Sequence, residues 1–228
     1  MGRTALSEPV GREAAAAPRG RFITLEGGEG AGKSTQAALL LAALHRAGIS
    51  ARQTREPGGS PGAEAVRRLL LDGDTGRWDA IGEALLLCAA RRDHVAAVIA
   101  PALAAGAWVV CDRFADSTIA YQGYGRGMAL ADLATLQRLT LDGLAPDLTL
   151  VFDLPVDLGL ARAAARPGAA DRFERLDRAF HERLHDGYLQ IAAAEPQRVA
   201  VIDAAADIDA VHRAVLAVVR DRLGIEVV

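Results

Sequence analysis

The sequence contains no asparagine and one lysine, Lys33, although lysine and arginine together number 26. The usual Asn-Lys-x-Asp motif of GTPase-type switches therefore cannot be present. Aromatic residues make up only 4% of the chain, and there are two cysteines, Cys88 and Cys111. Both cysteines lie in apolar surroundings without metal-ligand spacing, so we expect reduced thiols in the core and a cytoplasmic location.

The sequence also lacks a basic excess and a long apolar run. Its net charge is -3, which gives no indication of a nucleic-acid partner. Residues 95–111 carry no charge, but Pro101 and Gly106 divide them, so we predict a helix end, a turn and a buried strand, and no membrane span. Residues 1–20 mix charged residues, proline and glycine, and we expect a disordered extension.

What is present indicates one α/β domain over residues 21–228. The chain of 228 residues is 51% apolar, enough for a full core. Helical Ala/Leu/Arg patterns alternate with apolar segments that predict a largely parallel sheet. The predicted strands are 21–26, 50–54, 107–112, 148–153 and 198–203. Several of them end in aspartate, at the sheet edge where such folds bind ligands.

Residues 27–34 form the phosphate-binding loop G-x-x-x-x-G-K-S, between a predicted strand and a predicted helix. We expect its backbone N–H groups and the helix N-terminus to hold the phosphates of a nucleotide. Lys33 is expected to place a compact ammonium against these phosphates, where the broad fork of an arginine does not fit. The predicted nucleotide-binding residues are Gly27, Gly28, Glu29, Gly30, Ala31, Gly32, Lys33, Ser34 and Thr35.

A magnesium site is predicted beside this loop. The apolar strand 107–112 ends in Asp112, which can hold or orient Mg²⁺ through water together with the Ser34 hydroxyl. The alternative is an ordinary aspartate that caps the next turn. Arg113 favours the catalytic interpretation, because it places a cation where an acceptor phosphate would need one.

Arginines in residues 160–175 predict a short lid. Arg162 and Arg166 lie four residues apart on one helical face, and Arg172 follows a break that contains proline and glycine. Such a segment could close over a bound donor, exclude water and supply catalytic cations. A solvated arginine-rich helix face is the alternative.

Further polar residues could build a site for a second substrate. Arg55 and Pro57 lie in the turn TREPGGS, and Arg91 lies near the end of a predicted helix. Thr118, Tyr121 and Gln122 are suited to reading a base edge. Taken singly, each of these residues is as well explained by a surface turn or helix face.

One motif points elsewhere. Residues 181–185 read H-E-R-L-H, which matches the H-E-x-x-H pattern of zinc proteases. Asp186 and Gly187 follow at once, and His212 lies in a separate helical pattern. We therefore treat the match as chance and a zinc hydrolase as a distant alternative.

These motifs occur together, in an order that resembles bacterial thymidylate kinases over residues 20–222. The resemblance implies a P-loop fold of the nucleoside monophosphate kinase type, with a five-stranded parallel sheet. It also implies a cytoplasmic homodimer that transfers the γ-phosphoryl group of ATP to dTMP with Mg²⁺. Lys33 would bridge the two substrates, and Glu29 would face the dTMP sugar.

The resemblance also implies roles for the remaining residues. Arg91 and Arg113 would serve the acceptor phosphate and base, and Thr118, Tyr121 and Gln122 would contact thymine and deoxyribose. One branch of the family carries an arginine where this chain has Gly30, so the catalytic cation would come from the lid. Leu87 stands where the family commonly stacks an aromatic ring on thymine, which costs about 1 kcal/mol of stacking. A kinase of the same fold for another nucleoside or nucleotide, and a hydrolytic switch, remain the alternatives.

Overall fold

The structure is a computed structural model, and it describes residues 19–166 and 171–226. Most of the predicted extension, residues 1–18, lies outside the described residues. Arg19 and Gly20 are described and are attached to the domain. Arg19 forms an ion pair of 3.1 Å with Asp147, and the Gly20 N–H donates to the carbonyl of Leu103.

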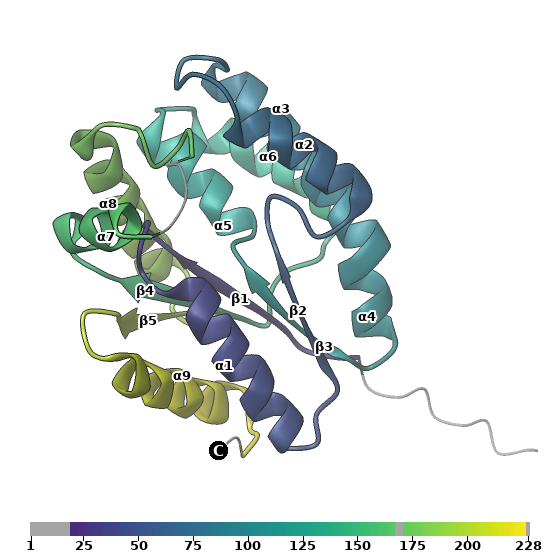
Figure 1. Cartoon of the computed structure of the whole chain (residues 1–228). Helices are drawn as coiled ribbons and strands as arrows, with labels where there is room; N and C mark the ends of the chain where they lie inside the picture. Colours follow the sequence, from purple (N-terminus) through teal and green to yellow (C-terminus); the bar gives the residue numbers. More distant parts are fainter. Residues whose placement is uncertain (1–18, 167–170, 227–228) are drawn as a thin grey trace, which may run out of the picture.

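Five parallel strands form one sheet in the order β2-β3-β1-β4-β5 (Figure 1). The strands are β1 Phe22–Gly27, β2 Ala51–Arg55, β3 Trp108–Asp112, β4 Leu148–Asp153 and β5 Val199–Asp203. Each predicted strand is confirmed to within one residue at either end. The central strand β1 is buried throughout, whereas the edge strand β2 is largely exposed, which explains why its sequence, ARQTR, is mostly polar.

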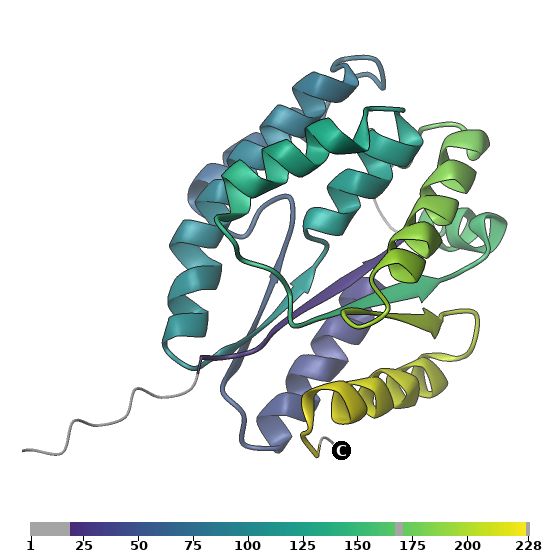
Figure 2. The ribbon, with the colours of Figure 1, turned by 180° about the vertical axis from the view of Figure 1, so that it is seen from behind.

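Helices cover both faces of the sheet, and three of them define the layers. Helices α1 Lys33–Arg46 and α9 Ile208–Leu223 pack together on one face (Figure 1). Helix α8 Arg178–Ala194 lies on the other face (Figure 2). The remaining helical elements are α2 Pro61–Leu71, α3 Ala80–His94, η1 Val95–Ile99, α4 Ala100–Ala104, α5 Ala115–Thr118, η2 Ile119–Gly125, α6 Leu130–Leu141 and α7 Val156–Ala164.

The uncharged run 95–111 has the predicted structure. It forms the π-helical η1, the short helix α4, a turn that includes Gly106, and the buried strand β3. Among the residues that the structure describes, no helix has the length and apolar character needed to cross a membrane.

The two faces of β1 explain how the core supports the site. Ile23 and Leu25 point into an apolar cluster with α1 and α9, while Phe22 packs against α4 and Phe114. Thr24 and Glu26 are also fully buried, although they are polar. A buried polar side chain needs a partner, and both find one: Thr24 bonds Thr149 of β4, and Glu26 lies beside α5 and α8.

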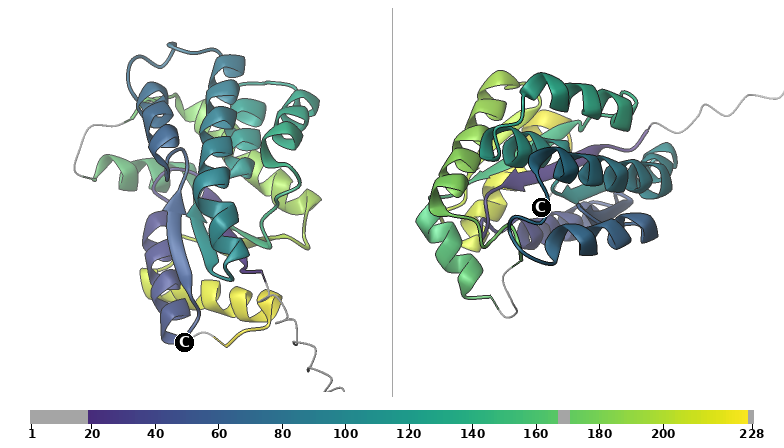
Figure 3. Two further views of the ribbon diagram at one scale, coloured as in Figure 1. Left: turned by 90° about the vertical axis from the view of Figure 1, so that its right-hand side faces the viewer. Right: turned by 90° about the horizontal axis from the view of Figure 1, so that it is seen from above.

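Because all strands are parallel, their carboxyl ends meet at one edge of the sheet. The phosphate-binding loop after β1, the turn after β2 and the segment after β3 converge there. Helices α2 and α3 lie side by side and border the same edge (Figure 3).

Candidate active site

The phosphate-binding loop connects β1 to α1 directly. Gly32 adopts a left-handed conformation with φ of +85°, and helix α1 begins at the next residue, Lys33. The Lys33 ammonium donates to the carbonyl of Gly28 at 2.6 Å, across the mouth of the loop. The helix N-terminus and the ammonium therefore face the same small volume, as an anion site requires.

Gly30 leaves no room for a side chain in this loop. Its φ is +66°, and a Cβ atom there would lie 2.1 Å from the carbonyl oxygen of Gly159 in α7. An arginine at this position would have to displace the α7 backbone. Any additional cation must come from another element.

Asp112 and Ser34 lie in direct contact. The Ser34 hydroxyl donates to the Asp112 carboxylate, which joins the end of β3 to the first turn of α1. Both side chains offer oxygen ligands, the type that Mg²⁺ prefers. Among the described residues, no group of three or more His, Cys, Asp or Glu residues could hold a metal ion, so an ion here would depend on phosphate oxygens and water as well.

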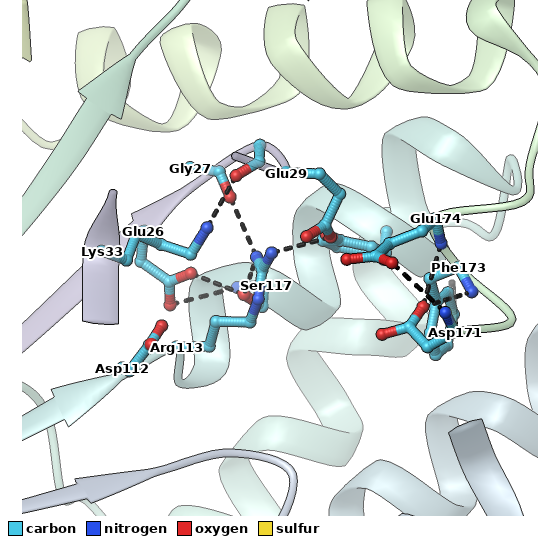
Figure 4. A network of polar contacts seen from close by, with 12 residues as sticks. Glu26, Gly27, Glu29, Lys33, Asp112, Arg113, Ser117, Asp171, Phe173 and Glu174 are labelled. Carbon is cyan, nitrogen blue, oxygen red and sulfur yellow. Dashed lines mark hydrogen bonds and ion pairs between the residues drawn. The ribbon is translucent and has the colours of Figure 1, made fainter. Parts of the chain in front are cut away.

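Arg113 occupies the centre of a polar network (Figure 4). Its φ is +67°, unusual for a residue with a side chain, and the guanidinium turns back under the phosphate-binding loop. It donates to the Glu29 carboxylate at 2.8 Å, to the Gly27 carbonyl at 2.9 Å and to the Tyr188 hydroxyl at 3.1 Å. Arg113 thus joins the loop to helix α8.

A buried carboxylate that the sequence analysis did not single out supports this arrangement. Glu26 accepts the Phe114 N–H at 2.8 Å and the Ser117 hydroxyl at 2.6 Å, and so fixes the turn that carries Arg113. Burial, together with the nearby charge of Asp116, raises the pKa of Glu26 to about 7. A charged residue in an otherwise apolar strand was the available signal in the sequence.

The charges around the loop are strongly coupled. Burial raises the pKa of Glu29, but the charges of Arg113 and Lys33 outweigh it and bring this pKa down to about 2. Burial and the charge of Arg113 lower the pKa of Lys33 to about 8, although Glu29 and Asp112 act in the opposite direction. The site therefore holds Lys33 as a cation that loses its proton unusually easily.

Arg91 lies below the site and is almost completely buried. Its guanidinium donates to Glu56 at 2.7 Å and to the Thr118 hydroxyl and the Phe114 carbonyl, both at 3.0 Å. One nitrogen, Nη1, is buried and has no hydrogen-bond partner among the described residues. Such an unpaired donor is costly unless a ligand uses it.

Thr118, Tyr121 and Gln122 follow on one helical stretch formed by α5 and η2. The Tyr121 hydroxyl donates to Glu29 at 2.5 Å, and burial raises the Tyr121 pKa. The Gln122 amide nitrogen donates to Glu83 of α3 at 2.9 Å, whereas the Gln122 carbonyl oxygen has no partner within the described part of the chain.

The three lid arginines separate into two groups. Arg162 donates to the carbonyl of Ala204 at 3.0 Å, and Arg166 pairs with Glu174. Arg172, in contrast, is fully buried and pairs with Glu83 at 2.5 Å. Part of the predicted lid, residues 167–170, lies outside the described residues.

A cavity of about 420 Å³ brings most of the predicted residues together. It runs from the phosphate-binding loop to Leu87 of α3 and Gln122 of η2. Its lining includes, of the predicted residues, Glu29, Gly30, Ala31, Gly32, Lys33, Ser34, Thr35, Arg55, Pro57, Leu87, Asp112, Arg113, Thr118, Tyr121, Gln122, Arg162 and Arg166. Gly27, Gly28, Arg91 and Arg172 are not part of the lining. Arg172 therefore does not face the cavity in this arrangement.

The cavity also has walls that the sequence analysis did not predict. They include Arg67, Leu71, Ser117, Asp171, Phe173 and Glu174. A second hollow of about 900 Å³ lies on the other side of the loop. It shares Arg162 with the first and is bordered by residues at the start of α9, among them Asp207 and Ile208. No local motif marks these residues, because only the fold brings them to the loop.

The two histidines of the H-E-R-L-H stretch have separate environments. His181 packs edge-on against Phe180, and burial lowers its pKa. His185 bonds Asp153 at 2.7 Å.

Three comparisons with known proteins agree. The sequence profile of the family described as Thymidylate kinase matches residues 25–215. The chain is 56% identical to the thymidylate kinase of Caulobacter vibrioides over 207 residues, which cover 91% of this chain and 99% of that protein. It is 55% identical to the thymidylate kinase of Nitrobacter hamburgensis, with 90% of each chain covered.

A solved structure, thymidylate kinase from Ehrlichia chaffeensis, matches with a TM-score of 0.73 and 35% identity. The match covers 89% of this chain and all of that one, in agreement with the five-stranded parallel sheet and the phosphate-binding loop. This chain belongs to the thymidylate kinase family.

Proposed function

We propose that this chain transfers the γ-phosphoryl group of MgATP to dTMP and so forms dTDP, a precursor for DNA synthesis. The observation that carries the proposal is the single cavity that joins the phosphate-binding loop with Lys33 to a chamber bordered by Leu87, Thr118 and Gln122. A donor and an acceptor bound at its two ends would meet at Lys33 and Arg113. Holding both phosphates in line is most of what a phosphoryl-transfer enzyme does.

The donor occupies the loop side. Backbone N–H groups of residues 27–35 and the Lys33 ammonium hold the ATP phosphates. The hollow between Arg162 and the start of α9 continues from the loop and receives the nucleoside part. Ser34 and Asp112 would hold Mg²⁺, which would neutralise charge on the phosphate oxygens.

The acceptor phosphate lies between Arg55 and Arg113. Arg55 lines the cavity and is half-exposed, with one ion pair to Glu64. Arg113 is fixed by Glu29 and the Gly27 carbonyl, so its charge is already in place before dTMP binds. Arg166 and Arg162 supply the cations from the lid, since Gly30 cannot.

Two unpaired polar atoms fit the edge of thymine. Gln122 lines the cavity, and its Oε1 is a buried acceptor without a partner within the described residues. Arg91 lies beneath the lining residue Thr118, to which it donates, and its Nη1 is a buried donor without a partner among the described residues. Thymine presents a carbonyl oxygen beside an N–H group, the complementary pair. Cytosine presents a donor and an acceptor in the reverse order, so this arrangement favours thymine and uracil.

The assembly and location follow the family resemblance. We propose a homodimer, since Ile81 and Leu85, four residues apart on α3, leave an apolar surface more than half-exposed. We propose a cytoplasmic location, which suits the two buried free cysteines.

An ADP-release assay tests this function. The purified chain is given MgATP with dTMP, dUMP, dCMP, dGMP, AMP, thymidine or no acceptor. We expect release to depend mainly on dTMP. Stimulation mainly by another acceptor would contradict the thymine selectivity but still support a kinase. Release without an acceptor would indicate a hydrolytic switch.

Lys33 offers a direct probe of donor binding, because it is the only lysine in the chain. Lysine labelled with ¹⁵N at Nζ gives one side-chain NMR signal, whose pH titration we expect near pH 8 in the free protein. ATP phosphates favour the charged form, so binding should raise this pKa, and ATP affinity should fall as the pH rises through 8. If saturating ATP does not change the pKa of Lys33, the ATP phosphates do not bind beside its ammonium.

A further inference from the structure

Glu83 is a buried carboxylate beside Gln122, and the proposed phosphoryl transfer does not use it. It lies on α3 and is fully buried. Its Oε1 accepts from Arg172 at 2.5 Å and from Arg126 at 2.7 Å, and its Oε2 accepts from the Gln122 amide nitrogen at 2.9 Å.

This contact decides how the Gln122 amide is oriented. An amide can present either its NH₂ group or its carbonyl oxygen to a neighbour, but a carboxylate in ion pairs has no hydrogen to donate. Only the NH₂ group of Gln122 can therefore face Glu83. The carbonyl oxygen points elsewhere and has no partner among the described residues, and Gln122 lines the cavity.

Glu83 itself cannot easily turn away. Two guanidinium groups hold it, and Arg172 is anchored further by donating to the Leu70 carbonyl at 2.8 Å. Arg172 belongs to the segment whose neighbours Asp171, Phe173 and Glu174 line the cavity. Losing one partner of such a buried ion pair would leave an uncompensated buried charge, so the arrangement is stiff.

We propose that Glu83 is a positioning residue that determines base selectivity: it fixes the Gln122 amide so that the carbonyl oxygen accepts from the ring N–H of the acceptor base. Thymine and uracil carry that N–H group, whereas cytosine carries an acceptor nitrogen there. The proposal rests on the proposed function, which places the base beside Gln122.

The test is the Glu83→Gln substitution. A neutral amide at position 83 can donate as well as accept, so Gln122 becomes free to flip and offer its NH₂ group to cytosine. We expect the kcat/KM ratio of dTMP to dCMP to fall by about 10-fold or more, since unpaired polar groups provide this type of discrimination. The ratio of dTMP to dUMP should stay unchanged, because both bases carry the N–H group.

Two further variants make the result specific. Gln122→Leu removes the amide, so adding Glu83→Gln to it should not change the dTMP to dCMP ratio further. Glu182→Gln neutralises an exposed carboxylate on α8 that forms a surface ion pair with Arg178, and it should leave both ratios as in the wild type.

The outcomes separate the two proposals. A wild-type chain that does not phosphorylate dTMP overturns both the function and the role of Glu83. A wild-type chain that selects dTMP, together with a folded Glu83→Gln variant that keeps the same dTMP to dCMP ratio, overturns only the role of Glu83. Equal losses for both nucleotides would indicate a purely structural residue and also overturn it.

If Glu83→Gln does not fold, the wild-type protein still gives the answer. The side-chain carbonyl carbon of Gln122, assigned in ¹³C spectra by its loss in Gln122→Leu, should shift when dTMP binds. The chemical shifts of the Gln122 NH₂ hydrogens, which face Glu83, should not change when dTMP binds. A shift of the NH₂ hydrogens without a shift of the carbonyl carbon would contradict the proposed orientation.

Discussion

Replacing Lys33 with methionine is expected to lower kcat by about 1,000-fold or more, because we propose that the ammonium lies between the donor and acceptor phosphates. The fold should survive the change. Lys33 is 7% exposed, and its ammonium donates to the Gly28 carbonyl. Methionine keeps the length of the side chain and removes a charge from a buried position. Steady-state kinetics and thermal unfolding measure the two effects.

Lys33→Arg is the matched control. It keeps the positive charge, but a guanidinium is broader than the ammonium that lies inside the loop beside the Gly28 carbonyl, so activity should not return. Recovery of most of the activity by arginine would show that charge alone matters at this position. If the Lys33→Met variant retains more than a tenth of wild-type kcat, Lys33 does not have the proposed catalytic role.

Replacing Arg113 with methionine is expected to lower kcat/KM for dTMP by about 100- to 1,000-fold, because the proposed cation at the acceptor phosphate is lost. The KM for ATP should change far less. This variant should also lose stability, by about 1–3 kcal/mol, because Glu29 and the Gly27 carbonyl lose a buried donor. Initial rates at varied dTMP and a denaturant titration measure both effects.

Arg113→Lys separates charge from geometry. Lysine cannot reach Glu29, Gly27 and Tyr188 at once from a backbone held at φ of +67°, so we expect little recovery of the dTMP reaction. Equal increases in the KM values of ATP and dTMP in Arg113→Met would contradict an acceptor-side role. They would indicate that the residue only holds the loop.

The phosphate-binding loop and the strands could be predicted because their signals are local. Gly27 to Ser34 form a contiguous motif, and each strand is an apolar segment bounded by turn residues. The same holds in part for Asp112, because the end of a strand places it at the edge of a parallel sheet where ligands bind. The pairing of β3 with β1, which is a tertiary contact, brings it beside the loop.

The supporting side chains could not be predicted because they depend on tertiary contacts. Tyr188 reaches Arg113 from α8, and Glu83 reaches Gln122 and Arg172 from α3. Nothing in the sequence near Tyr188 or Glu83 indicates these contacts. Glu26 is intermediate, since a charge within a buried strand suggests a special role but does not identify its partners.

The arginines of the predicted lid do not share one environment. Arg162, Arg166 and Arg172 share one short arginine-rich stretch, which suggested one role for all three. The structure separates them: Arg162 and Arg166 line the cavity, while Arg172 is bound to Glu83. The roles of Arg162 and Arg166 as catalytic cations stay predictions.

The most direct test of phosphoryl transfer to dTMP follows the transferred group. The chain is incubated with dTMP, Mg²⁺ and ATP labelled with ³²P at the γ-position, and the products are separated by chromatography. We expect the label to move into dTDP, with little inorganic phosphate, and we expect ATP consumption nearly to stop when dTMP is omitted. Label that appears as inorganic phosphate at the same rate with or without dTMP would contradict this expectation.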